Sequence, residues 1–159
     1  MAAIAQTATV MIHEARARVT VGIFADMPDA ATAAPDRESA QAALAFLTEM
    51  SPDLRGAAIL GPEGEVLAAT GEEPERWRED AAALFAAADG AEGTPVEQVH
   101  IATEQGEVFA VRNAGLAAVT VTDRFALASL MHFDMRSTLR RLASPNFGGS
   151  EPTEPRRGD

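Results

Sequence analysis

The stretch GAAILGPEGEVLAATGE, residues 56–72, places two short apolar runs on either side of a Pro-Glu-Gly-Glu turn. Pro62 restricts one backbone dihedral of the turn, and Gly64 can adopt a positive φ. The stretch therefore predicts a β-hairpin with strands at 57–60 and 66–69. It contains no nucleophile, no metal ligand and no phosphate-binding loop, so it indicates a role in assembly more than in chemistry.

The segment that follows the hairpin predicts a helix. Pro74 and several acidic residues stand at its start, where they suit the first turn of a helix. A single apolar stripe runs along it at helical spacing and consists of Trp77, Ala81, Leu84, Phe85 and Ala88. Two interpretations of Trp77 stay open: it packs into the chain's own core, or it anchors a partner within a charged rim.

Three further strands are predicted at 96–103, 107–112 and 116–122, separated by Gln105-Gly106 and by Asn113-Ala114-Gly115. Short connections favour an antiparallel meander. Because the first of these strands starts the meander, we expect it to form an edge of the sheet. An unpaired edge needs protection, and pairing with a second copy of the chain is one solution.

Two more helices are expected on either side of these strands. The first, after Pro35, has Asp36 as its N-cap and an inner face of Ala40, Ala43, Leu44, Leu47 and Met50. The second, 124–142, has Asp123 as its cap and an inner face of Leu127, Leu130, Met131, Met135, Thr138 and Leu142. The sequence thus predicts an α+β fold in which a five-stranded antiparallel sheet is flanked by helices.

The two ends of the chain lie outside this pattern. Residues 15–24 alternate apolar with polar side chains or Gly, which is typical of a strand, and 26–36 resemble a linker. We therefore predict an N-terminal extension at 1–35, one domain at 36–143 and a disordered tail at 144–159. The N-terminus has neither a signal peptide nor a membrane span, so a cytoplasmic protein without membrane insertion is expected.

Composition excludes several classes of function. The 159 residues carry a formal net charge of −11, and all 13 basic residues are Arg, so nucleic acid would be repelled. The absence of Cys excludes disulfides, thiolate nucleophiles and Cys-based metal sites.

No catalytic motif is present. His13-Glu14 begins a zincin-like pattern, but Ala17 stands where the second His is required. His100 is interpreted as a surface-facing strand residue, and only chance folding would bring two of the histidines together. We expect no enzyme activity, no metal and no cofactor.

The order of elements resembles the roadblock/dynein light chain superfamily over about residues 38–142. Three stretches carry the resemblance: LRGAAILGPEGEVLAATG is similar to the family's first hairpin, GEVFAVRNAGLAAVTVTD to its fourth and fifth strands, and LMHFDMRSTLRRL to its closing helix. The resemblance implies a roadblock/profilin-like α/β/α sandwich and a homodimer whose sheets join edge to edge.

Carried onto this sequence, the resemblance implies a dimer joint at strand 96–103, including Val99 and Ile101. It also implies that the stripe of Trp77, Ala81, Leu84, Phe85 and Ala88 packs near the two-fold axis. Members of the superfamily act as scaffolds or bind Ras-like small GTPases, in bacterial signalling among other settings. Such a GTPase would meet the exposed side of the same helix at Arg76, Arg78 and Glu79.

The alternative function is a ligand-sensing module of the profilin-like or PAS-like kind, which shares the sheet and flanking helices. It would require a pocket between helix and sheet, whereas small residues such as Ala57, Ala58, Ala68 and Ala69 favour close packing. A hydrolase or isomerase with a site assembled from distant segments is disfavoured, because no recognised site pattern occurs.

Overall fold

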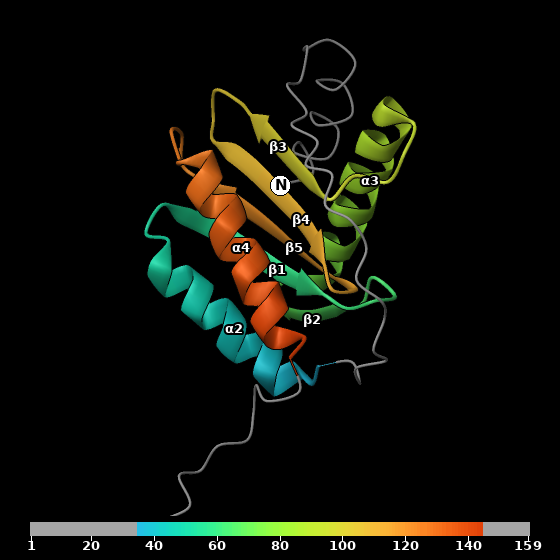
Figure 1. Cartoon of the computed structure of the whole chain (residues 1–159). Helices are drawn as coiled ribbons and strands as arrows, with labels where there is room; N and C mark the ends of the chain where they lie inside the picture. The colour runs from blue at the N-terminus through green and yellow to red at the C-terminus, as the bar shows by residue number, and fades with distance from the viewer. Residues whose placement is uncertain (1–34, 145–159) are drawn as a thin grey trace, which may run out of the picture.

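The computed structural model describes residues 35–144 as one antiparallel sheet with helices on both faces (Figure 1). The strands lie in the order β2-β1-β5-β4-β3, so that β2 and β3 form the two edges. The predicted strand at 15–24, the linker up to residue 34 and the tail from 145 lie outside the described residues. The elements are α2 (Arg37–Met50), β1 (Leu54–Leu60), β2 (Val66–Ala69), α3 (Pro74–Glu92), β3 (Gln98–Ala102), β4 (Glu107–Asn113), β5 (Leu116–Thr122) and α4 (Ala128–Leu142).

Helix α2 begins as the sequence predicts. The Asp36 carboxylate accepts a hydrogen bond of 2.7 Å from the backbone N–H of Ser39 and so satisfies one of the free donors of the first turn. Ala40, Ala43, Leu44 and Leu47 are buried as expected. Met50 was expected on the same face, and this is wrong: its side chain is 55% exposed. Met50 is the last residue of α2 and lies at the margin of the buried face, where the end of the helix leaves its side chain uncovered.

The hairpin predicted from residues 56–72 is confirmed, with β1 and β2 paired antiparallel. Gly64 has a φ of 78°, and the N–H of Gly61 donates to the carbonyl of Glu65 at 2.8 Å to close the turn. Strand β1 begins at Leu54, three residues before the predicted start, because it also pairs with β5 along its length. It is therefore an interior strand, buried on both sides.

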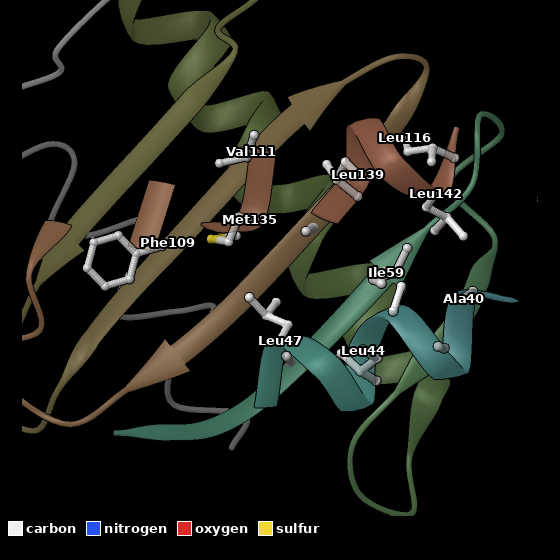
Figure 2. Close-up of a cluster of buried hydrophobic side chains, with 14 of the residues drawn as sticks. Ala40, Leu44, Leu47, Ile59, Phe109, Val111, Leu116, Met135, Leu139 and Leu142 are labelled. Atoms are coloured by element: carbon white, nitrogen blue, oxygen red, sulfur yellow. The ribbon is translucent and has the colours of Figure 1, made fainter. Parts of the chain in front are cut away.

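Two apolar cores lie on opposite faces of the sheet. Helices α2 and α4 cover one face, and Figure 2 shows Leu44 and Leu47 of α2 with Met135 and Leu139 of α4 over the strands. Helix α3 covers the other face. Because side chains alternate along a strand, each interior strand supplies residues to both cores, which explains its long buried run.

Helix α4 starts later than predicted. Asp123 does not cap it: its carboxylate forms an ion pair with Arg55, and the helix begins at Ala128 without a side-chain cap. Leu127 and Leu130 were expected to face inward and are 67% and 53% exposed. The helical spacing was right, but the inner face is centred on Met131 and Met135 instead.

The β3–β4 turn depends on Gly106. Its φ is +155°, and a Cβ placed there would lie 2.4 Å from the backbone carbonyl oxygen of Thr122. Gly106→Ala is therefore expected to lower the free energy of unfolding by at least about 2 kcal/mol, measured by urea denaturation. Gly90 is the matched control, because it lies in α3 with open space around it. Gly90→Ala is expected to raise stability by about 0.5–1 kcal/mol, and equal losses in both variants would contradict this account.

Candidate interaction surfaces

The apolar stripe of α3 packs against the chain's own sheet. Trp77, Ala81, Leu84, Phe85 and Ala88 are all buried, and they form one cluster with β1, β3, β4 and β5. The indole N–H of Trp77 donates to the carbonyl of Thr70 at 3.2 Å. This burial supports the interpretation of Trp77 as a core residue of the single chain. A contact of the stripe with a second copy stays a prediction, and a partner would approach α3 from its other side.

The position of Trp77 explains the glycine in β1. A Cβ at Gly56 would lie 3.0 Å from Cζ2 of Trp77, which is closer than side chains tolerate without displacement. The indole therefore lies close to the backbone of an interior strand, and the N-terminal end of α3 approaches the sheet closely.

The predicted partner-binding residues of α3 are exposed. Arg76 forms an ion pair with Glu73 one turn earlier, whereas Arg78 and Glu79 point into solvent. No hydrogen bond or ion pair holds Arg78 within the described part of the chain, so its guanidinium is available to an incoming carboxylate.

An open groove of about 810 Å³ lies beside α3. Arg78 and Asp89 line its helix side, and the turns at 61–64 and 113–115 line the rest. Its base is fixed by Arg112, whose guanidinium lies 3.0 Å from both carboxylate oxygens of Asp89 and 4.0 Å from the ring centre of Phe85. The groove combines segments that are far apart in the sequence, so sequence patterns could not predict it.

Within residues 35–144, strand β3 pairs only with β4, so that its other edge is open, as predicted. The N–H of Arg112 donates to the carbonyl of Glu97, and the N–H of Thr103 donates to the carbonyl of Gly106. Hydrogen-bonded pairs alternate along an antiparallel ladder. The N–H groups of His100 and Ala102 therefore point away from β4, toward the open edge. The strand is shorter than the predicted 96–103, because the N–H of Val96 donates to the Asp89 carboxylate instead.

A row of three β-branched side chains lies next to this edge. Ile101, Val108 and Val121 are register neighbours across β3, β4 and β5, and they lie on the α3 face of the sheet. All three are only partly buried, whereas Val99 and Val119 nearer the centre of α3 are buried. The row is therefore an apolar strip that α3 leaves incompletely covered and that ends at the edge strand β3.

A histidine cluster occupies the opposite face of β3 and β4. The His100 ring stacks on Phe109 with centroids 4.4 Å apart, and its Nε2 lies 2.7 Å from Oε2 of Glu107. His132 from α4 meets Phe109 edge-on at 5.4 Å and lies 6.3 Å from His100. His100 was expected to face the surface, and its side chain is 30% exposed; the rest is covered because α4 folds back over the strand. Across residues 35–144, no group of three or more acidic or histidine side chains is arranged to hold a metal ion.

Glu107 was not identified from the sequence. It is only 8% exposed, and its second oxygen accepts a 2.7 Å hydrogen bond from the N–H of Phe125. This carboxylate thus joins the β3–β4 hairpin to the loop before α4. The one sequence feature that could have indicated its role is the position of an acidic residue at the start of an otherwise apolar strand.

The stability of the fold is expected to depend on His132. Burial lowers its pKa below the usual 6.5, and the neighbouring charges of His100 and Arg136 act in the same direction, while a hydrogen bond with the Val99 carbonyl opposes them. The folded state therefore favours neutral His132. This stabilisation is complete above pH 6.5 and is lost as the pH falls through the lowered value. Urea unfolding at about pH 7.5, 6.5 and 5.5 should show a smaller loss for His132→Gln than for wild type, and equal losses would contradict the assignment.

Within the described residues, no helix is both long enough and apolar enough to span a bilayer.

Comparison with solved structures supports the fold. No protein-family model and no curated protein matches the sequence. The chain is similar to the gliding protein MglB of Thermus thermophilus, with a TM-score of 0.54 and 18% identity over 78% of this chain and 96% of that one. Myxococcus xanthus MglB gives a TM-score of 0.50 and 10% identity over 75% of this chain and 92% of that one. A Roadblock/LC7 domain from Streptomyces avermitilis gives a TM-score of 0.49 and 20% identity over 63% of this chain and 91% of that one.

The two MglB comparisons, together with the observed sheet and helices, confirm the predicted α+β fold, a five-stranded antiparallel sheet flanked by helices. At identities of 10% and 18% they establish the fold alone.

Proposed function

We propose that the chain is a non-catalytic homodimeric scaffold or regulator that binds a Ras-like small GTPase in the cytoplasm. The observation that carries the proposal is the open edge of β3 beside an incompletely covered apolar row. The roadblock-type fold and the resemblance noted from the sequence supply the class of partner. The chemistry of a catalytic site is not needed for this role.

The dimer is proposed to form by antiparallel pairing of two β3 strands across a two-fold axis. The outward N–H and C=O groups of His100 and Ala102 would then find partners, which an exposed edge otherwise lacks. The row of Ile101, Val108 and Val121 would continue across the joint and lose its contact with water. A two-fold axis perpendicular to the sheet also keeps both copies of α3 on one face.

The GTPase is proposed to meet α3 on the side away from the sheet. Arg76, Arg78 and Glu79 are exposed there, and the groove beside α3 offers space for a projecting segment of a partner. In a dimer the two α3 helices would form one continuous platform. Charged residues at the rim of such an interface chiefly set specificity and association rate.

Arg78 provides the test of this surface. Arg78→Glu is expected to weaken binding to the cognate small GTPase at least about tenfold, because a rim cation is replaced by an anion. The measurement is titration calorimetry with the GTPase in its GDP state and in its GTP-analogue state. Arg37 is the matched control: it is also an exposed helical arginine, but it lies on α2, across the sheet from α3.

Arg37→Glu should leave the GTPase affinity unchanged. If both substitutions weaken binding equally, long-range charge and not the α3 surface determines affinity. If wild-type protein binds the GTPase in neither nucleotide state, the proposed function is wrong.

A ligand-sensing role is the second candidate, because an open groove lies beside α3. Its volume of about 810 Å³ falls within the range of small-molecule sites. The groove is bordered by surface turns and has its cation Arg112 already paired with Asp89, which favours a protein segment over a small ligand. Saturable binding of a small metabolite that Phe85→Trp abolishes, without any GTPase binding, would support the sensing role instead.

A further inference from the structure

The large apolar side chains that stand exposed among residues 35–144 all lie on one layer of the molecule. They belong to α2, to α4 or to the loop that leads into α4, and none belongs to α3. Figure 1 shows α2 and α4 side by side on the same face of the sheet. We name these residues the outer apolar face: Phe46, Met50, Phe125, Leu127, Leu130 and Phe133. A surface of this kind normally marks an interaction site.

The fold holds part of this face in position. Phe125 is 83% exposed and has a φ of +69°, which bulky residues rarely adopt. Its backbone N–H is held by the buried carboxylate of Glu107 at 2.7 Å. An aromatic side chain is thus displayed to solvent by a specific internal hydrogen bond.

The charges beside the outer apolar face have both signs, because α2 carries Glu38 and Glu49 beside Arg37, whereas the charges of α4 are mostly basic. Helix α4 carries Arg136, Arg140 and Arg141 against the single acid Asp134, although the whole chain has a net charge of −11. Leu127, Leu130 and Phe133 are spaced three residues apart, so that each adjoins the next on the helix surface. The α4 side of the face therefore suits an apolar segment that has acidic residues at one end.

We propose that residues 19–24 of the same chain, Val-Thr-Val-Gly-Ile-Phe, cover the outer apolar face. This segment supplies Val19, Val21 and Ile23 at alternate positions, and it is followed by Asp26 and Asp29. Its apolar side chains match the face. Asp26 and Asp29, which follow it, complement the arginines of α4, and Arg16 and Arg18, which precede it, complement Glu38 and Glu49 of α2. The segment acts as a built-in cover for the layer opposite α3.

The length of the connecting chain permits this arrangement. The described residues begin at 35, immediately before α2, and α2 itself has 14 residues. Such a helix is about 21 Å long. Residues 25–34 can extend to about 33 Å, so residues 19–24 can reach any point of the face. Because the segment is tethered, its effective concentration exceeds that of any separate partner in dilute solution.

Engineered cysteines test the proposal directly, because the chain contains no cysteine of its own. The full chain is made with Val21→Cys and Leu130→Cys, and the control carries Val21→Cys and Ala83→Cys. Ala83 is exposed on α3, across the sheet from the outer apolar face. Under mild oxidation the first pair should form an intramolecular disulfide at least roughly tenfold faster than the control. Equal rates, or disulfides only between two chains, would overturn the proposal.

A second measurement avoids any perturbation by the disulfide. Phe133→Cys is labelled with a maleimide in the full chain, with and without Val19→Asp and Ile23→Asp. The aspartates should release the cover and raise the labelling rate roughly tenfold. An unchanged rate would show that residues 19–24 do not cover the face and would overturn the proposal. Neither measurement requires a GTPase, so failure of the proposed function would leave both results interpretable.

Discussion

Phe109→Ala is expected to lower the free energy of unfolding by about 3–5 kcal/mol, the largest loss of stability among the substitutions considered. Phe109 is 0% exposed and belongs to the core cluster that β4 shares with α2 and α4 (Figure 2). Its ring contacts the rings of His100 and His132, so the substitution removes both ring contacts at once. Urea denaturation followed by circular dichroism measures the change.

Phe109→Leu is the graded control for this prediction. Leucine retains most of the apolar volume, so its cost should be less than half that of alanine. A loss below about 1 kcal/mol for Phe109→Ala would contradict the assignment of Phe109 to the core. The same variant should also shift the pH dependence of stability, because the cavity would alter the burial of His132.

Ala102→Pro is expected to convert the proposed dimer into a monomer at micromolar concentration. Ala102 is exposed, and its N–H points to the open edge of β3 and not to β4. Proline therefore removes a donor that only a second strand could use, and its ring obstructs the approach of that strand. Sedimentation equilibrium should give twice the chain mass of 16.7 kDa for wild type and the single mass for the variant.

Ala102→Val is the matched control, because valine keeps the N–H and favours extended structure. This variant should stay dimeric. Far-ultraviolet circular dichroism should show that Ala102→Pro remains folded, since no β3–β4 hydrogen bond is lost. A dimeric, folded Ala102→Pro variant would contradict pairing through this edge.

Local patterns predicted much of the fold. The stripe of α3 and the inner face of α2 follow from helical spacing, and the strand order of the meander follows from short turns. The edge position of β3 followed from its place at the start of the meander. These features depend on contacts between neighbours in sequence, which the sequence displays directly.

Features that depend on distant segments could not be predicted. Leu127 lies three residues before Leu130 and four before Met131, which is helical spacing, but only the packing of α4 decides which apolar residues are covered. The approach of His132 to His100 depends on how α4 crosses β3. Likewise, the groove requires α3 and two separate turns to meet.

The two interpretations of Trp77 illustrate the same limit. A large aromatic residue that is flanked by charged residues in the sequence can pack into the chain's own core or can bind a partner at an interface. Gly56, far earlier in the chain, accommodates the indole on the sheet, and this distant match makes Trp77 a core residue of the single chain.

Amide hydrogen exchange at β3 tests the central claim, that two open edges pair, most directly. When the concentration of wild-type protein exceeds the dissociation constant of the dimer, the N–H groups of His100 and Ala102 should exchange slowly. Their rates should equal those of Val99 and Ile101, whose N–H groups bond to β4. Dilution should restore fast exchange at His100 and Ala102, and Ala102→Pro should restore it at His100. Fast exchange of His100 and Ala102 at every concentration, with Val99 and Ile101 protected throughout, would contradict the account.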